Sequence, residues 1–324
     1  MTTIRFLVAA VVAAGTLGVA QAQTTTLKIG YATNLQSHYG VGSTVFCDEV
    51  EKGTQGRYKC QHFPSSALGG EREQIEAVQL GTQDMTNTST GPVGNFVPEV
   101  KIVDIPFLFR DYDHARKVMD GPVGQDILTK FASKNLIALA WTENGFRHMT
   151  NNKRAISKPA DAAGLKMRTM ENKVHMDGYR TFGILPTPMA FPELFGALQQ
   201  GTVDGQENPI PVILASKFSQ VQKHLSLTGH VYSPALLLLS PKVWAKLNDA
   251  DKKVFSDAAK KASVAQRKKV NDDENNGIAQ LEKDGMTVIK TVDGSAFRDA
   301  LKPAYDSYAK EFGADNIKRI QDVR

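Results

Sequence analysis

The 324-residue sequence lacks the motifs on which most enzyme and metal-site assignments rest. It has two cysteines and seven histidines, and no two histidines stand three or four positions apart beside a carboxylate, as a zinc site requires. The H-E-x-x-H motif, the P-loop, the G-x-S-x-G elbow and a complete dinucleotide-binding glycine signature are all missing. These absences argue against an enzyme, a bound metal and a bound cofactor.

Long uncharged apolar segments are also missing beyond the first twenty residues, and the strongest later apolar run, residues 235–239, has only the length of a strand. Arg5 precedes a run without charge from Phe6 to Ala20, and Ala20-Gln21-Ala22 then gives the small-residue pattern of a cleavage site. The run is about fifteen residues long, shorter than the roughly 20 residues of a spanning helix. We therefore expect residues 1–22 to be a signal peptide cleaved after Ala22 and the mature chain to be exported. An uncleaved membrane anchor is the alternative.

The length and composition are those of a soluble globular protein. About 300 mature residues exceed the size at which one hydrophobic core usually stops growing, so two domains are expected. The chain is 41% hydrophobic and 23% charged, with a net charge of +5, and its lysines are scattered. Because no compact basic patch with interleaved aromatics is present, we expect no nucleic-acid partner. The mild basicity is compatible with an anionic ligand.

The two cysteines, Cys47 and Cys60, are thirteen positions apart in the exported part of the chain. In an oxidising compartment an isolated pair of this kind indicates one disulfide closing a small loop. A metal site lacks nearby ligands of suitable spacing, and two free thiols are the remaining alternative.

Strand and helix patterns alternate along most of the mature chain. Helix ends are marked by glycines such as Gly81 and Gly201. The alternation is typical of an α/β protein with a parallel sheet. The predicted strands are 27–31, 58–63, 84–88, 136–141, 165–168 and 203–206, and the predicted helices between them include 39–51, 71–80, 174–182 and 192–200.

A much longer helix is predicted near the C-terminus. Asn248 or Asp249 suits its N-cap, and the helical pattern runs to about Asp284. Gly277 is a weak point within it. The cluster at residues 271–276 resembles a calcium loop only loosely, because its Asp and Gly spacing fails the EF-hand pattern, so a solvated helix face is expected there.

Four segments together carry a family resemblance. They are Asn144-Gly145-Phe146-Arg147, Gly164-Leu165-Lys166-Met167-Arg168, Pro186-Thr187-Pro188-Met189-Ala190-Phe191 and Val203-Asp204-Gly205-Gln206-Glu207-Asn208-Pro209. In this order they closely resemble the solute-binding proteins of tripartite ATP-independent periplasmic (TRAP) transporters, and the likeness covers nearly the whole mature chain.

The resemblance implies a two-domain periplasmic binding protein fold with a hinge, an interdomain ligand cleft and a long bracing helix. We map domain I to residues 23–150 and domain II to residues 151–240. Residues 241–324 would hold the long helix and a C-terminal segment packed across both domains.

The resemblance also implies a carboxylate site. Arg168, at the end of its strand, would form a two-pronged salt bridge with the ligand carboxylate, a geometry that the planar guanidinium offers and lysine does not. Arg147 and Asn208 would support the carboxylate, and Phe191 would supply an apolar wall.

Contacts from domain I are implied less specifically. Thr88 and Ser89 lie in a loop expected to close over the ligand, and Asn144 belongs to the Arg147 motif. Glu71 follows two glycines and is expected near the ligand. The sequence does not decide whether His148, His175 or Trp141 touches it.

The implied function is capture of a small organic carboxylate in the periplasm. Sugar acids, hydroxy or oxo acids and dicarboxylates are all compatible ligands. The implied partner is an ion-coupled permease with a small and a large membrane subunit, and the binding protein is expected to be a monomer. The alternatives are a secreted enzyme acting on a carboxylate, or a binding protein for an ATP-driven importer or a sensor.

Overall fold

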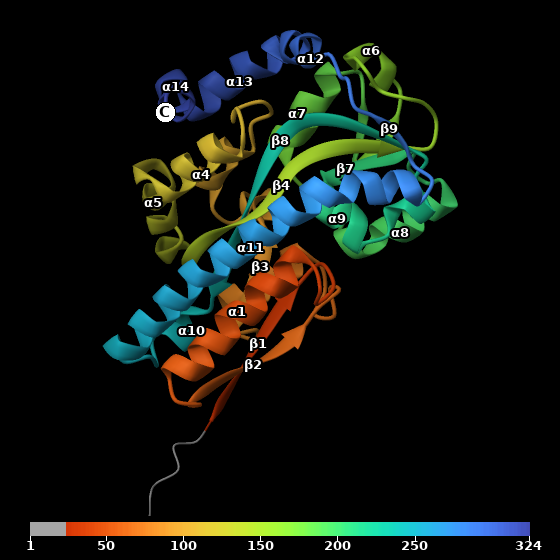
Figure 1. The fold of residues 1–324 in the computed structure, drawn as a ribbon. Helices are drawn as coiled ribbons and strands as arrows, with labels where there is room; N and C mark the ends of the chain where they lie inside the picture. Colours follow the sequence, from red (N-terminus) through yellow and green to blue (C-terminus); the bar gives the residue numbers. More distant parts are fainter. Residues whose placement is uncertain (1–23) are drawn as a thin grey trace, which may run out of the picture.

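The computed structural model describes residues 24–324. The expected signal peptide and its cleavage after Ala22 lie outside the described residues. In this part of the chain, nine strands form one mixed sheet in the order β2-β1-β3-β8-β4-β7-β5-β6, with β9 paired to β8 (Figure 1). Within residues 24–324 no helix is long and apolar enough to cross a membrane.

One end of the sheet forms the N-terminal lobe. Here β1 (Thr25–Tyr31) pairs in parallel with β2 (Tyr58–Phe63) on one side and β3 (Met85–Ser89) on the other. The connections are α1 (His38–Gly53) and α2 (Glu71–Leu80). These elements match the predicted strand–helix alternation, because their hydrophobic periodicity and capping residues agree.

Helix ends in both lobes are set by local backbone chemistry. Ser37 Oγ accepts a hydrogen bond from the backbone of Gly40 at 3.2 Å and caps α1. Gly81 and Gly201 end their helices with φ of 73° and 70°, in the left-handed region that glycine adopts without strain. Both predicted helix ends are therefore confirmed.

The other end of the sheet forms the second lobe. Strand β5 (Lys166–Thr169) pairs in parallel with β6 (Leu185–Pro188) and β7 (Gly205–Pro209). Its helices are α7 (Lys173–Thr181), α8 (Phe191–Gln200) and α9 (Ile210–Ala215).

Two details of the second lobe differ from the sequence prediction. Residues 185–188 form an edge strand although two prolines stand there, since an edge strand leaves one side of its backbone unpaired and tolerates proline. Strand β7 runs from Gly205 to Pro209 rather than over residues 203–206, because its buried register is set by pairing with β4 and β5.

Two long strands run through both lobes. Strand β4 (Ile137–Asn151) and strand β8 (His224–Leu239) pair antiparallel along most of their length (Figure 1). The sequence predicted only residues 136–141 for β4 and recognised only 235–239 as strand-like in β8. The extensions were missed because they carry polar side chains that tertiary partners satisfy, such as Glu143, which is bound by Arg116 at 2.6 Å.

These long strands also change the sheet type. Strand β8 pairs antiparallel with β3, and β4 pairs antiparallel with β7. The parallel pairing expected from the βαβ rhythm is present within each lobe, and the antiparallel strands β4 and β8 join the two parallel units.

The long helix α11 (Asp249–Lys283) lies across both lobes and is capped by Asn248 (Figure 1). On the N-terminal lobe, Phe255 packs edge-on against Phe46 with ring centroids 5.7 Å apart. At the second lobe, a Cβ on Gly277 would come within 2.5 Å of Leu214, so glycine permits α9 to approach closely. The predicted helix is confirmed, and Gly277 lies inside it.

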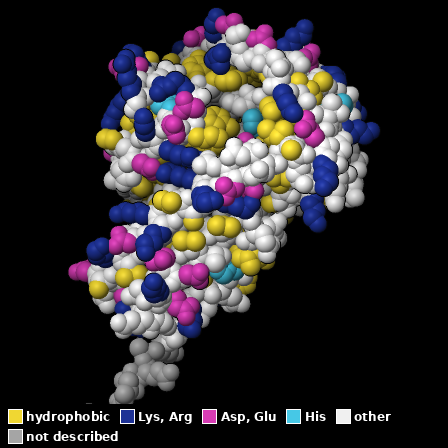
Figure 2. Space-filling model, viewed as in Figure 1, with side chains coloured by type: hydrophobic (Ala, Val, Ile, Leu, Met, Phe, Trp, Pro, Cys, Tyr) yellow, Lys and Arg dark blue, Asp and Glu magenta, His cyan; other side chains and the backbone are white. Residues whose placement is uncertain are grey.

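The segment at residues 271–276 lies within α11 as a helix face. Lys268 pairs with Asp272 at 2.6 Å along this face. Figure 2 shows acidic and basic side chains interspersed over the visible face of the molecule, with no sign dominating a large area.

The remaining elements are short helices and one short strand, and the last three helices form the C-terminal segment. They are α3 (Thr90–Val93), η1 (Pro98–Asp104), α4 (Tyr112–Asp120), α5 (Pro122–Thr129), η2 (Ala132–Lys134), α6 (Pro159–Ala162), η3 (Phe218–Gln220), α10 (Pro241–Trp244), β9 (Thr287–Ile289), α12 (Gly294–Ala300), α13 (Lys302–Phe312) and α14 (Ala314–Gln321).

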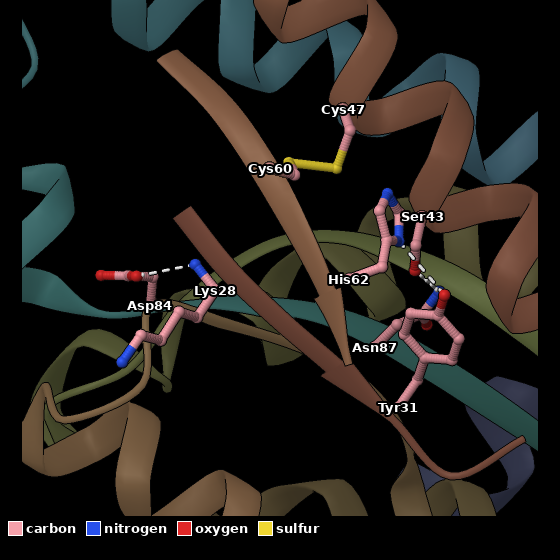
Figure 3. Close-up of a disulfide and its surroundings, with 8 residues drawn as sticks. All are labelled: Lys28, Tyr31, Ser43, Cys47, Cys60, His62, Asp84 and Asn87. Carbon is pink, nitrogen blue, oxygen red and sulfur yellow. Dashed lines mark hydrogen bonds between the residues drawn. A yellow bond between two sulfur atoms is a disulfide. The ribbon is translucent and has the colours of Figure 1, made fainter. Parts of the chain in front are cut away.

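The predicted disulfide is confirmed. Cys47 on α1 and Cys60 on β2 are bonded, with their Cα atoms 5.6 Å apart. Figure 3 shows the bridge at β2, and the Tyr31 hydroxyl on the neighbouring strand β1 lies 3.1 Å from Nδ1 of His62 on β2. The bridge ties α1 to the outer strand of the N-terminal lobe.

Candidate ligand-binding cleft

A narrow cleft lies where the two lobes and strand β4 meet. The N-terminal lobe contributes the loop after β1, the start of α1, the start of α2 and the end of β3. The second lobe contributes the end of β5, the start of α8 and strand β7. The lining residues are Ala32, Thr33, Tyr39, Glu71, Ser89, Asn144, Arg168, Met170, Phe191, Asn208 and Val212.

The cleft brings together six of the eight predicted ligand-binding residues, namely Arg168, Asn208, Phe191, Ser89, Asn144 and Glu71. Arg147 and Thr88 are buried behind this lining. A wider groove between α5 and the C-terminal helices, lined in part by Ile102, Phe312 and Ile320, contains none of the predicted residues.

Arg168 is buried in the cleft with its charge largely uncompensated. Its side chain is 2% exposed, and Nη1 is buried without a hydrogen-bond partner among the described residues. Nε donates to the backbone carbonyl of Met189 at 2.9 Å, and the guanidinium lies 5.8 Å from the ring centroid of Phe191. Burial lowers the pKa of Arg168 to about 10, which still leaves the side chain charged at neutral pH.

Arg147 differs because the structure gives it a carboxylate partner. Its Nε and Nη2 bind the side chain of Glu207, the latter at 2.9 Å, and Nη2 also donates to the Glu207 carbonyl at 2.6 Å. Burial acts against the charge, but Glu207 outweighs it and raises the pKa of Arg147. The Arg147 Nη1 group is buried and has no hydrogen-bond partner among residues 24–324.

Glu207 is the main residue of this region that the sequence analysis left without a role. Arg147 lies opposite Pro209 in the β4–β7 pairing, so Glu207, two positions from Pro209, stands diagonally across on the same face. Burial would raise the pKa of Glu207, but Arg147 and His230 hold it well below its usual range. Tyr179 also donates to Glu207 at 3.0 Å. The only sign of its role in the sequence was its position inside the motif at residues 203–209.

Asn208 connects the Arg147–Glu207 pair to the cleft. Its side-chain oxygen accepts from Arg147 Nη2 at 3.1 Å, and its amide donates to Gln206 at 2.5 Å. Asn144 is fixed in a comparable way, since its oxygen lies 3.0 Å from His38 Nε2. Both amides are therefore held by protein contacts on one side while they line the cleft on the other.

The N-terminal lobe supplies an acidic and hydroxyl-rich wall. Glu71 accepts hydrogen bonds from the Thr88 hydroxyl at 3.1 Å and from the Ser89 backbone at 2.7 Å. Tyr39, which the sequence analysis missed, lines the cleft, and its hydroxyl is buried without a partner among the described residues. Burial raises the pKa of Tyr39 well above its ordinary value, so this hydroxyl remains a donor at neutral pH.

Phe191 serves both the cleft and the core. It begins α8, lines the cleft and lies 6.1 Å from Phe218 by ring centroids.

The two histidines and the tryptophan left undecided do not line the cleft. His148 accepts from the Gly229 backbone at 3.0 Å, and the Trp141 indole donates to the Gly124 carbonyl at 2.9 Å. His175 is buried and stacks on Tyr179. Burial lowers the pKa of His175 to about 3, so it is neutral.

A two-lobed α/β fold with a narrow polar cleft between the lobes, which contains a buried arginine, defines a periplasmic-type binding protein. The chain belongs to the family of bacterial extracellular solute-binding proteins, family 7, whose model matches residues 29–311. The resemblance to TRAP solute-binding proteins is thereby confirmed, and the chain is a binding protein rather than an enzyme.

Individual relatives agree with this assignment. A solute-binding protein of Verminephrobacter eiseniae is 55% identical over 300 residues, covering 93% of this chain and 90% of the relative. The crystal structure of a TRAP periplasmic solute-binding protein from Polaromonas sp. JS666, bound to D-erythronate, is 77% identical with a TM-score of 0.92, covering 93% and 99% of the two chains.

A second solved TRAP periplasmic solute-binding protein, from Bordetella, contains electron density that was interpreted as pantoate. It is 53% identical with a TM-score of 0.91 and covers 93% of this chain and 100% of the other.

Proposed function

We propose that this protein captures a small hydroxylated carboxylate in the periplasm and delivers it to an ion-coupled TRAP permease with a small and a large membrane subunit. One observation carries the ligand part of the proposal: Arg168 is buried at the cleft, and its guanidinium has no carboxylate partner among residues 24–324. A buried charge without a partner is costly, so the site is suited to receive an anion.

Arg168 would hold the ligand carboxylate through two parallel hydrogen bonds. The unpartnered Nη1 of Arg147 would add a further donor, and Asn208 and Asn144 would contact the carboxylate or a neighbouring hydroxyl. Glu207 keeps Arg147 oriented, so this second arginine is a positioned donor rather than a second free charge.

The opposite wall suits hydroxyl groups. The Tyr39 hydroxyl, Ser89 and Glu71 would exchange hydrogen bonds with them, Thr88 would act through Glu71, and Phe191 would cover the carbon chain. The D-erythronate complex of the 77% identical Polaromonas protein supports a short sugar acid as the ligand class.

Closure of two domains would bury the ligand, with domain I at residues 23–150, domain II at 151–240 and residues 241–324 packed across both. Contacts between the lobes support this: the Asn34 side chain donates to the Ala215 carbonyl at 2.9 Å, and Arg72 lies 3.5 Å from Glu171. The closed, loaded form would be the one that the permease recognises.

Calorimetry with D-erythronate tests the ligand part. The wild-type protein should bind, and Arg168→Lys should weaken binding by about 2 kcal/mol or more because the two-pronged geometry is lost, which is roughly thirtyfold or more in Kd. Arg180→Lys is the matched control, since Arg180 is 56% exposed and pairs with Asp177 on α7. Equal affinities of all three proteins would refute the role of Arg168.

The permease part and the export step need separate tests. Uptake of labelled ligand by vesicles holding the two membrane subunits should require this protein and an ion gradient but no ATP. Uptake driven by ATP would refute this partner. Mass spectrometry of the exported protein should show a chain that starts at Gln23.

A further inference from the structure

Glu71 is a fixed negative charge in the cleft. Its Oε1 accepts from the Thr88 hydroxyl at 3.1 Å and from the Ser89 backbone at 2.7 Å, and its Oε2 accepts from the Ser89 hydroxyl at 3.0 Å. Ser89 is 1% exposed and Thr88 is fully buried. Three hydrogen bonds from a buried strand end therefore prevent the carboxylate from turning away from the cleft.

The carboxylate of Glu71 still has room for one more donor. An ionised carboxylate offers about four acceptor positions and no donor, and the protein occupies three of them. A ligand hydroxyl can donate to the position that remains. A ligand carboxylate cannot, because it carries no proton at neutral pH.

The charges that line the cleft leave nothing to balance a second ligand carboxylate. Glu71 and Arg168 are the charged residues of the lining. At the outer edge, Arg72 and Glu171 pair with each other at 3.5 Å. Once Arg168 holds one carboxylate, a second would lie in a narrow space with Glu71 and without a free cation from the lining.

We propose that Glu71 restricts the site to monoanions, because it accepts a hydrogen bond from a ligand hydroxyl and repels a second ligand carboxylate. Like charges placed together disfavour a wrong partner, and specific binding sites often use such a repulsive contact. This inference rests on the proposed function, since it places the first carboxylate on Arg168.

Two ligands of equal carbon skeleton test the proposal. D-Erythronate ends in a CH2OH group, and meso-tartrate is the same skeleton with that group oxidised to a second carboxylate. Calorimetry at neutral pH gives the ratio of the two dissociation constants. The wild-type protein should prefer D-erythronate by at least about a hundredfold.

Glu71→Gln removes the charge with little change in shape. Its side-chain oxygen can still accept from Thr88 and Ser89, and the Ser89 hydroxyl can rotate to accept from the new amide. The preference for D-erythronate should fall by at least about tenfold, mainly through tighter binding of meso-tartrate.

Glu71→Asp and Glu76→Gln are the controls. Glu71→Asp keeps the charge and should keep the preference even where both ligands bind more weakly. Glu76→Gln removes the same charge from an exposed position of the same helix and should leave the affinity for both ligands unchanged. Thermal melts confirm that each variant folds.

The outcomes separate the two proposals. An unchanged ratio in Glu71→Gln, or an equal loss of preference in Glu71→Asp, would overturn the charge filter and leave the proposed function standing. Failure of the wild-type protein to bind any hydroxylated monocarboxylate would overturn the proposed function itself.

Discussion

Two buried arginines, Arg147 and Arg168, lie on neighbouring parts of the sheet but have opposite surroundings. Arg147 is fully buried against Glu207, and burial and pairing together leave its pKa raised. Arg168 is 2% exposed, and its pKa is lowered because burial is not offset by a paired carboxylate. The first arrangement is complete within the protein, whereas the second is suited to completion by an anionic ligand. The contrast separates a residue that holds the fold from one that is placed to hold a solute.

Breaking the Arg147–Glu207 pair should have the largest effect on the free energy of unfolding. Glu207→Gln leaves Arg147 as an uncompensated buried charge and should lower the free energy of unfolding by about 3–5 kcal/mol. Denaturant unfolding at neutral pH measures the loss. The double variant Arg147→Met/Glu207→Leu removes both charges and should lose clearly less. A double variant that is less stable than Glu207→Gln would contradict this account.

Two buried carboxyl groups, Glu207 and Asp104, also differ in whether a cation lies beside them. The pH dependence of the free energy of unfolding can distinguish them. Glu207 is held ionised, whereas Asp104 is fully buried with only Thr90 and Asn172 as hydrogen-bond donors among the described side chains. Burial raises the pKa of Asp104 to about 7, above the unfolded value of roughly 3.9. The unfolded chain therefore releases this proton at lower pH than the folded one.

The contribution of Asp104 to the free energy of unfolding therefore falls as the pH rises from about 4 to 7, by roughly 1 kcal/mol per pH unit. Asp104→Asn should remove that slope, as unfolding measured at several pH values between 5 and 7 would show. The pH dependence from Glu207 has the opposite sign, because the pKa of Glu207 is lowered. Its contribution to the free energy of unfolding is present above about pH 4 and is lost in acid. Parallel pH profiles of wild type and Asp104→Asn would contradict the assignment to Asp104.

The smallest stability effect is expected at Arg168. Arg168→Met loses the hydrogen bond to Met189 but also removes a buried, uncompensated charge, so the free energy of unfolding should change by less than about 1 kcal/mol. Arg147→Met, in contrast, should be strongly destabilising because it leaves Glu207 unpaired. Unfolding measured without added organic acid compares them. A large loss in Arg168→Met would show that Arg168 also supports the fold.

Local patterns predicted much of this protein. The helices ended by Gly81 and Gly201 and the cap of α11 at Asn248 follow from backbone chemistry within a few residues. The disulfide followed from two cysteines in an exported chain. These features depend on neighbouring residues or on composition, which a sequence displays directly.

Features that depend on distant partners were missed or shortened. The extensions of β4 and β8 look polar, and only contacts such as that between Glu143 and Arg116 make burial of those residues favourable. Glu207 and Tyr39 went unassigned, because a glutamate in a strand and a tyrosine near a helix start are ordinary until the fold surrounds them.

The sequence by itself determined the class of the protein, its α/β alternation, its long helix and the arginines of its motif segments, because each is written in residue type and short-range spacing. The tertiary structure decided how those arginines differ. Only folding brings Glu207 against Arg147 and places Arg168 in the same cleft lining as Glu71 without a paired carboxylate among the described residues. Since the free energy of a buried charge depends on what lies within a few ångströms of it, residue identity alone does not set it.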